Sequence, residues 1–248
     1  MLSTTYMAVI LLASLSIIST IIGVALAFYF KKSVKGIVVG IGFSAGIMLL
    51  ISFFELIPES VEITGISKTS IALISGVLFI GVLNFIIPHT HLIKEKGHIN
   101  GHLLKTAYLI AFGLILHDFP EGFAMASSYI HSPSLGLLIA LAITIHNVPE
   151  EFAMAVPLLL TKKKKVLFKA AFLSALAEPA GAVLGLTAVG FLPGLNPLFM
   201  AFAAGAMIFI SLNELLPMAH KYKRKSLFIL GMILSVIVYI GLAMLVPA

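Results

Sequence analysis

The sequence predicts an all-α polytopic membrane protein with eight transmembrane helices, and two observations support this prediction. Of the 248 residues, 60% are apolar and only 10% are charged, whereas soluble domains carry about 25% charged residues. The apolar residues also gather in runs of about 20 residues, which is the length that an α-helix needs to cross the hydrocarbon core of a bilayer.

Eight such runs follow one another along the chain, and we expect each to form one transmembrane helix. Their approximate limits are 6–30, 35–58, 69–88, 103–130, 133–160, 166–191, 196–218 and 226–246. Because the connections are too short for a soluble domain, residues 1–248 are expected to form a single transmembrane domain. The longest connection is a histidine-containing loop at residues 89–102.

The basic residues predict the orientation of the spans. Every lysine and arginine except Lys68 lies in or beside the first, third, fifth and seventh connections, and short loops rich in these residues face the cytoplasm. Both termini are therefore expected outside the cytoplasm of a multi-pass protein of the cell (inner) membrane. This role also explains the net charge of +6, so no nucleic-acid partner is expected. The N-terminus lacks the basic region of a cleavable signal peptide, so the first run is expected to remain as a span.

Two internal repeats are predicted to be inverted. "HDFPEGFAMA" (117–126) and "HNVPEEFAMA" (146–155) lie in spans four and five, which run in opposite directions. "FSAGIMLLISFFELIP" (43–58) and "FAAGAMIFISLNELLP" (202–217) relate spans two and seven in the same way. Spans 1–3 are thus expected to repeat as spans 6–8, and span four as span five. Inverted repeats with proline-interrupted helices are typical of secondary transporters, with the site near the bilayer midplane.

The short repeat places metal-ligand side chains within the membrane. His117 and Glu121 are one helical turn apart, so they share one face of span four. The same spacing relates His146 to Glu150 in span five. Three further polar residues are candidates for the same site: Asp118, Asn147 and Glu178.

A purely structural role for these residues is energetically unfavourable. A charged side chain at the centre of a transmembrane helix costs roughly 2.5 to 3.5 kcal/mol, so four carboxylates would together cost about 10 kcal/mol or more. A bound cation, or protons in its absence, would offset this cost. The chain has no cysteine, and imidazole with carboxylate suits Zn²⁺, Fe²⁺ or Mn²⁺ better than Ca²⁺ or Na⁺. The ligands are compatible with one ion, or with two ions that share Glu121 and Glu150.

The sequence resembles the ZIP family of zinc and iron transporters, and most of all its bacterial members. The family motif His-Asn-x-Pro-Glu-Gly corresponds to "HDFPEG" in span four and "HNVPEE" in span five. The resemblance implies a transporter rather than an enzyme. Such a protein would move Zn²⁺ into the cytoplasm by alternating access, with Fe²⁺, Mn²⁺ and Cd²⁺ as further candidates. A block that contains spans four and five would move against a scaffold that includes spans two and seven.

The resemblance also implies partners. These are the divalent metal cations and the lipid bilayer, while a homodimer is left open. No cofactor is expected besides the transported metal, bound at one or two sites.

The resemblance further implies roles for individual residues. The first metal site would consist of His117, Glu121, His146 and Glu150. The second would consist of Asp118, Asn147 and Glu178 together with the two shared glutamates. Met48 falls where the family can place an extra ligand to the first site, although a methionine on a helix is more often a core residue. Asp118 replaces the family's asparagine, and Glu151 replaces its glycine; the role of Glu151 is left open.

Glu55 and Glu214 occupy matching positions in the long repeat, near the outer end of span two and the cytoplasmic end of span seven. We expect them to act as a symmetric pair of relays on the pathway, although glutamates in contact with water at the membrane surface would look the same. In the third loop, His89 and His91, with His98 and His102, are candidates to receive the released ion or to sense cytoplasmic metal; a solvated polar loop is the alternative. His131 and His220 have no assigned role.

Two other classes of protein compete with the transporter. An intramembrane metal-dependent hydrolase would use similar ligands with one open position for an activated water. However, the chain lacks an HExxH pair, and hydrolysis does not need a ligand set duplicated in inverted copies. A metal-sensing receptor would require a soluble signalling domain, which these short connections do not provide. The sequence therefore favours transport.

Overall fold

The computed structural model describes residues 2–30, 33–86, 116–160 and 164–246. Within these ranges the chain is almost entirely helical and has no β-strand. Seven helical stretches of the described residues are long and apolar enough to cross a membrane, which confirms the all-α polytopic membrane fold. The predicted loop 89–102, with His89 and His91, lies outside the described residues, as does the first half of the predicted fourth span.

The first four spans are built as follows. The first span consists of α1 (Leu2–Ala13) and α2 (Leu15–Tyr29), which only Ser14 separates. The second consists of α3 (Val34–Ile51), the π-helical turn η1 (Ser52–Leu56) and α4 (Ile57–Thr64). The third is α5 (Ile66–Ile86). The described part of the fourth span is helical over residues 116–131.

The fifth and sixth spans are two long helices, α7 (Pro133–Leu160) and α8 (Lys164–Phe191). The seventh span contains η3 (Pro193–Leu195), α9 (Asn196–Ile210), the π-helical turn η4 (Ser211–Leu215) and α10 (Leu216–Lys221). The eighth is α11 (Lys225–Leu245). Helix 116–131 and α7 both continue through the proline of their motif, so neither proline ends its helix.

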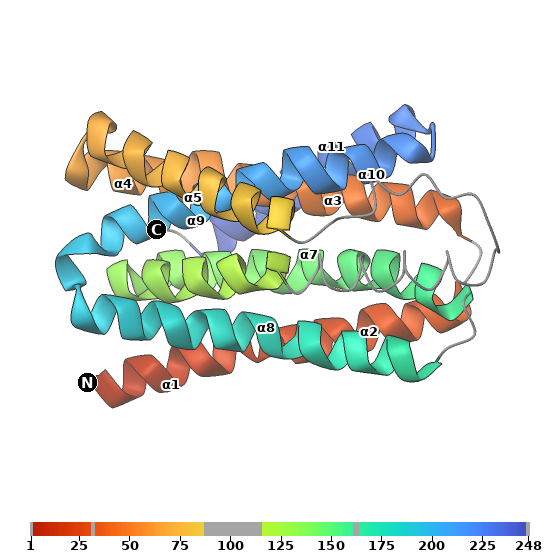
Figure 1. Ribbon diagram of the computed structural model, residues 1–248, viewed down its shortest axis with the longest axis horizontal. Coiled ribbons are helices and arrows are strands. Elements are labelled where there is room, and N and C mark those ends of the chain that lie inside the picture. Colours follow the sequence, from red (N-terminus) through yellow and green to blue (C-terminus); the bar gives the residue numbers. More distant parts are fainter. Residues whose placement is uncertain (1, 31–32, 87–115, 161–163, 247–248) are drawn as a thin grey trace.

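The helices pack in two groups that lie side by side along the long axis of the molecule (Figure 1). In one group α11 packs along α3, and α5 packs along α9. In the other, α2 packs along α7, and α8 contacts α1, α2 and α7. Contacts between α3 and α7 join the groups. Span five thus lies in a different group from spans two and seven.

The outer faces of both groups expose large apolar side chains. In one group these include Leu78 and Phe85 of α5 and Ile237 of α11, and in the other they include Ile21 of α2 and Phe172 of α8. A soluble monomer rarely exposes such a continuous apolar surface. In a bilayer the same surface contacts acyl chains, and the backbone polar groups are satisfied within each helix. The exposed residues therefore agree with a multi-pass membrane protein.

The two copies of the long repeat share the same irregularity. The turns η1 and η4 occupy matching positions, and each is closely followed by a proline, which cannot donate to the helical hydrogen-bond ladder. The first residues of these turns, Ser52 and Ser211, donate hydrogen bonds to the carbonyl oxygens of Met48 and Met207 at 2.8 Å and 2.9 Å. This local likeness supports the repeat, while its inverted orientation in the membrane stays a prediction.

Candidate metal centre

Glycines allow the helices that carry the candidate ligands to approach closely. A Cβ atom on Gly122 would lie 1.9 Å from the carbonyl oxygen of Glu178. A Cβ atom on Gly181 would lie 2.0 Å from the carbonyl oxygen of Phe119. Because any other residue would clash with backbone at these positions, the glycines determine how near α8 lies to helix 116–131. Glu121, the neighbour of Gly122, and Glu178 on α8 are both fully buried beside this contact.

Each of the two histidines contacts the glutamate of the other helix, so the contacts cross between helix 116–131 and α7. The Nε2 atom of His117 lies 2.5 Å from Oε1 of Glu150. The Nε2 atom of His146 lies 3.1 Å from Oε1 of Glu121, and 3.8 Å from Oε2 of Glu150. Ligand atoms of His117, Glu121 and Glu150 all lie within 4.8 Å of one another. One metal ion could therefore contact side chains from both copies of the short repeat.

A backbone contact orients the ring of His146. Its Nδ1 atom lies 2.9 Å from the carbonyl oxygen of Ala142, and since a carbonyl only accepts, Nδ1 carries a proton. In the neutral ring, Nε2 then presents a lone pair to the glutamates. Such a contact is favourable only with a cation between the groups, either a proton or a metal ion. Metal-binding histidines are commonly oriented in this way by a hydrogen bond from the other ring nitrogen.

The four side chains of this cluster are buried, with exposed fractions from 0% to 4%. Among the described residues, no lysine or arginine forms an ion pair with Glu121 or Glu150. Removing an ion from water costs several kcal/mol unless a partner charge compensates it. The arrangement of His117 and His146 against these carboxylates is therefore suited to a divalent cation.

Asn147 and Glu178 form a second polar pair, between α7 and α8. The Asn147 amide donates a hydrogen bond to Oε2 of Glu178 at 2.9 Å. Within the described part of the chain, the remaining oxygens, Oδ1 of Asn147 and Oε1 of Glu178, are buried without a hydrogen-bond partner. Because buried polar atoms are normally paired, these two oxygens are available to a bound cation.

Asp118 and Glu151 meet at a residue that the sequence analysis did not single out. The hydroxyl of Ser174 in α8 contacts Oδ2 of Asp118 and lies 2.5 Å from Oε1 of Glu151. Oε1 of Glu151 also accepts a hydrogen bond from Thr20 of α2 at 3.0 Å. Ser174 could have been noticed as the residue one helical turn before Glu178. No sequence signal marks Thr20.

Helix α3, which belongs to the other helix group, borders the metal centre. The hydroxyl of Ser44 donates to the carbonyl oxygen of His146 at 3.0 Å. Met48, one turn further along α3, is fully buried. Its sulfur lies 3.6 Å from the hydroxyl oxygen of Ser211. A role of Met48 as a metal ligand stays a prediction.

The two predicted relay glutamates are half-buried, and each has a partner on another span. The hydroxyl of Tyr239 in α11 donates to Oε1 of Glu55. The amide of Asn84 in α5 donates to Oε1 of Glu214 at 3.3 Å. These contacts agree with the long repeat. Glu55 of span two contacts span eight, and Glu214 of span seven contacts span three, which is the counterpart of span eight. Their role as relays stays a prediction.

The two unassigned histidines lie away from this cluster. The Nε2 atom of His131 lies 2.9 Å from Oε2 of Glu59, with 28% and 33% of the two side chains exposed. His220 is exposed in α10. Neither belongs to the group of His117, Glu121 and Glu150.

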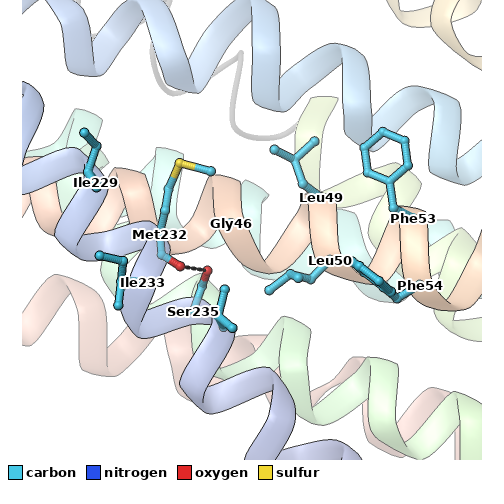
Figure 2. A pocket seen from close by; sticks show the side chains of 10 residues that line it. Gly46, Leu49, Leu50, Phe53, Phe54, Ile229, Met232, Ile233 and Ser235 are labelled. Atoms are coloured by element: carbon cyan, nitrogen blue, oxygen red, sulfur yellow. Dashed lines mark hydrogen bonds between the residues drawn. The ribbon is translucent and has the colours of Figure 1, made fainter.

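An apolar groove of about 260 Å³ lies between the second span and α11 (Figure 2). Ser235 is the only polar side chain in its lining, and its hydroxyl donates to the carbonyl oxygen of Met232 at 2.6 Å. The groove offers neither an imidazole nor a carboxylate to a metal ion. The candidate metal centre is therefore the His/carboxylate region between helix 116–131, α7 and α8.

The fold and this geometry define a multi-pass membrane protein with a buried centre suited to divalent transition-metal ions. A family model described as "ZIP Zinc transporter" matches residues 87–246. The chain is 38% identical to "Zinc transporter ZupT" of Chlorobium phaeovibrioides, over 90% of this chain and 92% of that protein. For the proteins of the same name from Streptococcus mutans and Nitratidesulfovibrio vulgaris, the identities are 37% and 35%. These cover 92% and 86% of this chain, and 93% and 88% of the relatives.

The chain therefore belongs to the ZIP family. This membership confirms the resemblance that the two motifs indicated. Since the family consists of membrane transporters, it also confirms that the protein is not an enzyme. The hydrolase interpretation is thereby discarded.

Proposed function

We propose that this protein transports divalent transition-metal cations, with Zn²⁺ as the main cargo, across the cell membrane into the cytoplasm. The observation that carries the proposal is the buried cluster in which ligand atoms of His117, Glu121 and Glu150 lie within 4.8 Å of one another. The printed names of the relatives, "Zinc transporter ZupT", support Zn²⁺ as the cargo. Imidazole with carboxylate is also compatible with Fe²⁺, Mn²⁺ and Cd²⁺.

In this proposal the metal ion binds at one or two adjacent sites. The first site consists of His117, Glu121, His146 and Glu150. Met48 borders this site, and a sulfur neighbour of bound zinc would identify it as an additional ligand. The second consists of Asp118, Asn147 and Glu178, and it shares the two glutamates with the first. The unpartnered oxygens of Asn147 and Glu178 support the second site. A divalent ion at either site would compensate carboxylates that are otherwise buried at a cost.

Alternating access would follow from movement of one helix group against the other. The group with α7 and α8, which helix 116–131 approaches closely at Gly122, would carry the ion, while the group with α3 and α9 would serve as the scaffold. The separate packing of the two groups supports this division. Glu55 and Glu214 would act as relays on either side, and His89 and His91 would receive the released ion. Residues 1–248 would work as one transmembrane domain with both termini outside, and a homodimer stays open.

The experiment that tests this function is metal uptake into proteoliposomes that contain a Zn²⁺-sensitive dye. We expect saturable Zn²⁺ uptake that protein-free vesicles lack, and competition by Fe²⁺, Mn²⁺ and Cd²⁺ would rank the cargo metals. Imposing a proton gradient or a membrane potential would identify the driving force. If the protein binds Zn²⁺ but no Zn²⁺ enters the lumen under either gradient, transport is refuted.

A further inference from the structure

A separate acidic group lies next to the candidate metal centre, at the point where α2, α7, α8 and helix 116–131 meet. Its members are Asp118, Glu151, Ser174 and Thr20, joined by the contacts of the two hydroxyls with the two carboxylates. Asp118 is 5% exposed and Glu151 is 3% exposed. Glu151 and Ser174 each lie one helical turn from the pair Asn147 and Glu178. The group is therefore an extension of the polar region and not part of the His/carboxylate cluster.

The hydrogen bonds within this group do not satisfy its carboxylates. The single hydroxyl proton of Ser174 can be donated to Asp118 or to Glu151 but not to both. Thr20 supplies one further donor, to Oε1 of Glu151. Oε2 of Glu151 is buried and has no hydrogen-bond partner among the described residues. Two buried carboxylates thus have more acceptor oxygens than donors.

No basic side chain compensates the charge of the group. Among the described residues, no lysine, arginine or histidine forms an ion pair with Asp118 or Glu151. A buried carboxylate without a partner charge is strongly unfavourable. The charge of the group is therefore neutralised either by protons on its carboxyl groups or by a bound cation that is not part of the described protein.

Backbone packing holds the group in place. A Cβ atom on Gly23 would lie 2.6 Å from Cβ of Glu151 and 2.6 Å from the carbonyl oxygen of Val148. The glycine thus allows α2 to approach α7 directly at Glu151. Thr20, one turn before Gly23, is brought to the Glu151 carboxylate by the same approach. The oxygen atoms are positioned by helix packing rather than by a surface loop.

We propose that Asp118, Glu151, Ser174 and Thr20 form an additional site, with oxygen ligands only, for a divalent cation such as Mn²⁺ or Mg²⁺. Carboxylate and hydroxyl oxygens without imidazole or sulfur suit these oxygen-preferring ions, and the charge of a divalent ion matches two carboxylates. The site goes beyond the proposed zinc transport and does not require it. Asp118 lies at the boundary between this site and the second site of the metal centre.

Mn²⁺ binding, followed by electron paramagnetic resonance on the full-length protein in lipid nanodiscs, tests the proposal. The protein is first loaded with one molar equivalent of Zn²⁺, which prefers the imidazole-containing centre, and is then titrated with Mn²⁺. We expect bound Mn²⁺ whose pulsed spectrum lacks the ¹⁴N modulation of a coordinated imidazole. Glu151→Gln and Ser174→Ala should each weaken this binding about tenfold or more. The matched control Glu62→Gln changes an exposed glutamate of α4 and should bind Mn²⁺ like the wild type.

Three results would overturn the proposal: no Mn²⁺ binding by the Zn²⁺-loaded protein, ¹⁴N modulation from the bound Mn²⁺, or wild-type affinity in the Glu151→Gln variant. Ser174→Ala decides the question if Glu151→Gln does not fold, because it removes only a hydroxyl. A double variant, His117→Ala with His146→Ala, should lose Zn²⁺ binding but keep the Mn²⁺ signal. Wild-type protein that binds Mn²⁺ here but does not take up Zn²⁺ would refute zinc transport alone.

Discussion

The Nε2 atom of His117 lies 2.5 Å from Oε1 of Glu150, although the two residues belong to different copies of the short repeat. The reciprocal contact joins His146 to Glu121 at 3.1 Å. Spacing in the sequence pairs each histidine with the glutamate of its own helix, whereas in the folded protein the shorter contact of each histidine is with the glutamate of the other helix. These contacts couple helix 116–131 to α7 through the proposed ion site. A change in either helix should therefore affect metal binding by both.

The first prediction concerns the ligands of bound zinc. X-ray absorption spectroscopy of the Zn²⁺-loaded protein should show only nitrogen and oxygen neighbours at about 2.0 to 2.2 Å, with the multiple scattering of imidazole. His117→Ala with His146→Ala should remove the imidazole signal. A sulfur neighbour would instead come from a methionine, because the chain has no cysteine, and its loss in Met48→Leu would identify Met48 as the ligand.

The second prediction concerns the contact of Gly122 with α8. Gly122→Ala should lower both the yield of folded protein and its Zn²⁺ uptake, because the added Cβ would lie 1.9 Å from the Glu178 carbonyl oxygen. Gly194→Ala is the matched control, since its Cβ would meet nothing within 4 Å. Monodispersity on size-exclusion chromatography and uptake in proteoliposomes measure the two effects. Equal behaviour of both variants would refute the close approach.

The third prediction concerns the hydrogen bond from Asn147 to Glu178. Asn147→Ala should destabilise the metal-free protein by about 1 to 3 kcal/mol, because it leaves a buried carboxylate oxygen without its donor. The apparent melting temperature in detergent without metal measures this effect, with the exposed Asn213→Ala as a control. An unchanged melting temperature of the Asn147→Ala variant would contradict the contact.

The fourth prediction is that the ion pair of Glu59 and His131 contributes little. About a third of each side chain is exposed, and exposed ion pairs typically contribute about 0 to 1 kcal/mol. Glu59→Gln, His131→Gln and the double variant should differ only slightly from the wild type in melting temperature, and less at high salt. A large coupling energy in this double-mutant cycle would give the pair a structural importance that its exposure does not suggest.

The limits of the spans could be predicted from the sequence because apolar length and basic flanks determine them. The predicted fifth span, 133–160, coincides with α7, and the predicted sixth, 166–191, differs from α8 only at its start. The second span was predicted to end at residue 58 but continues to Thr64. Its last residues are polar, and a hydropathy criterion does not detect a helix that extends beyond the apolar run.

The main side chains of the candidate centre could also be predicted, because their spacing and their repetition are visible in the sequence. Ser174 and Thr20 could not, since isolated hydroxyls on apolar helices carry no motif. Their contacts with Glu151 depend on how closely α2 and α8 approach α7, and Gly23 makes the approach of α2 possible. The π-helical turns η1 and η4 were not predicted either, because a local shift in the helical hydrogen-bond register does not change the amino-acid composition or the hydropathy of the span.

The central claim is that metal crosses the membrane through the His/carboxylate centre. The most direct test is Zn²⁺ uptake by the double variant Glu121→Ala with Glu150→Ala, reconstituted at the same protein density as the wild type. The exposed Glu62→Ala serves as the matched control, and circular dichroism verifies that each variant is folded. We predict saturable uptake by the wild type and the control, and only the leak of protein-free vesicles for the double variant. Uptake by the folded double variant at the wild-type rate would contradict the account.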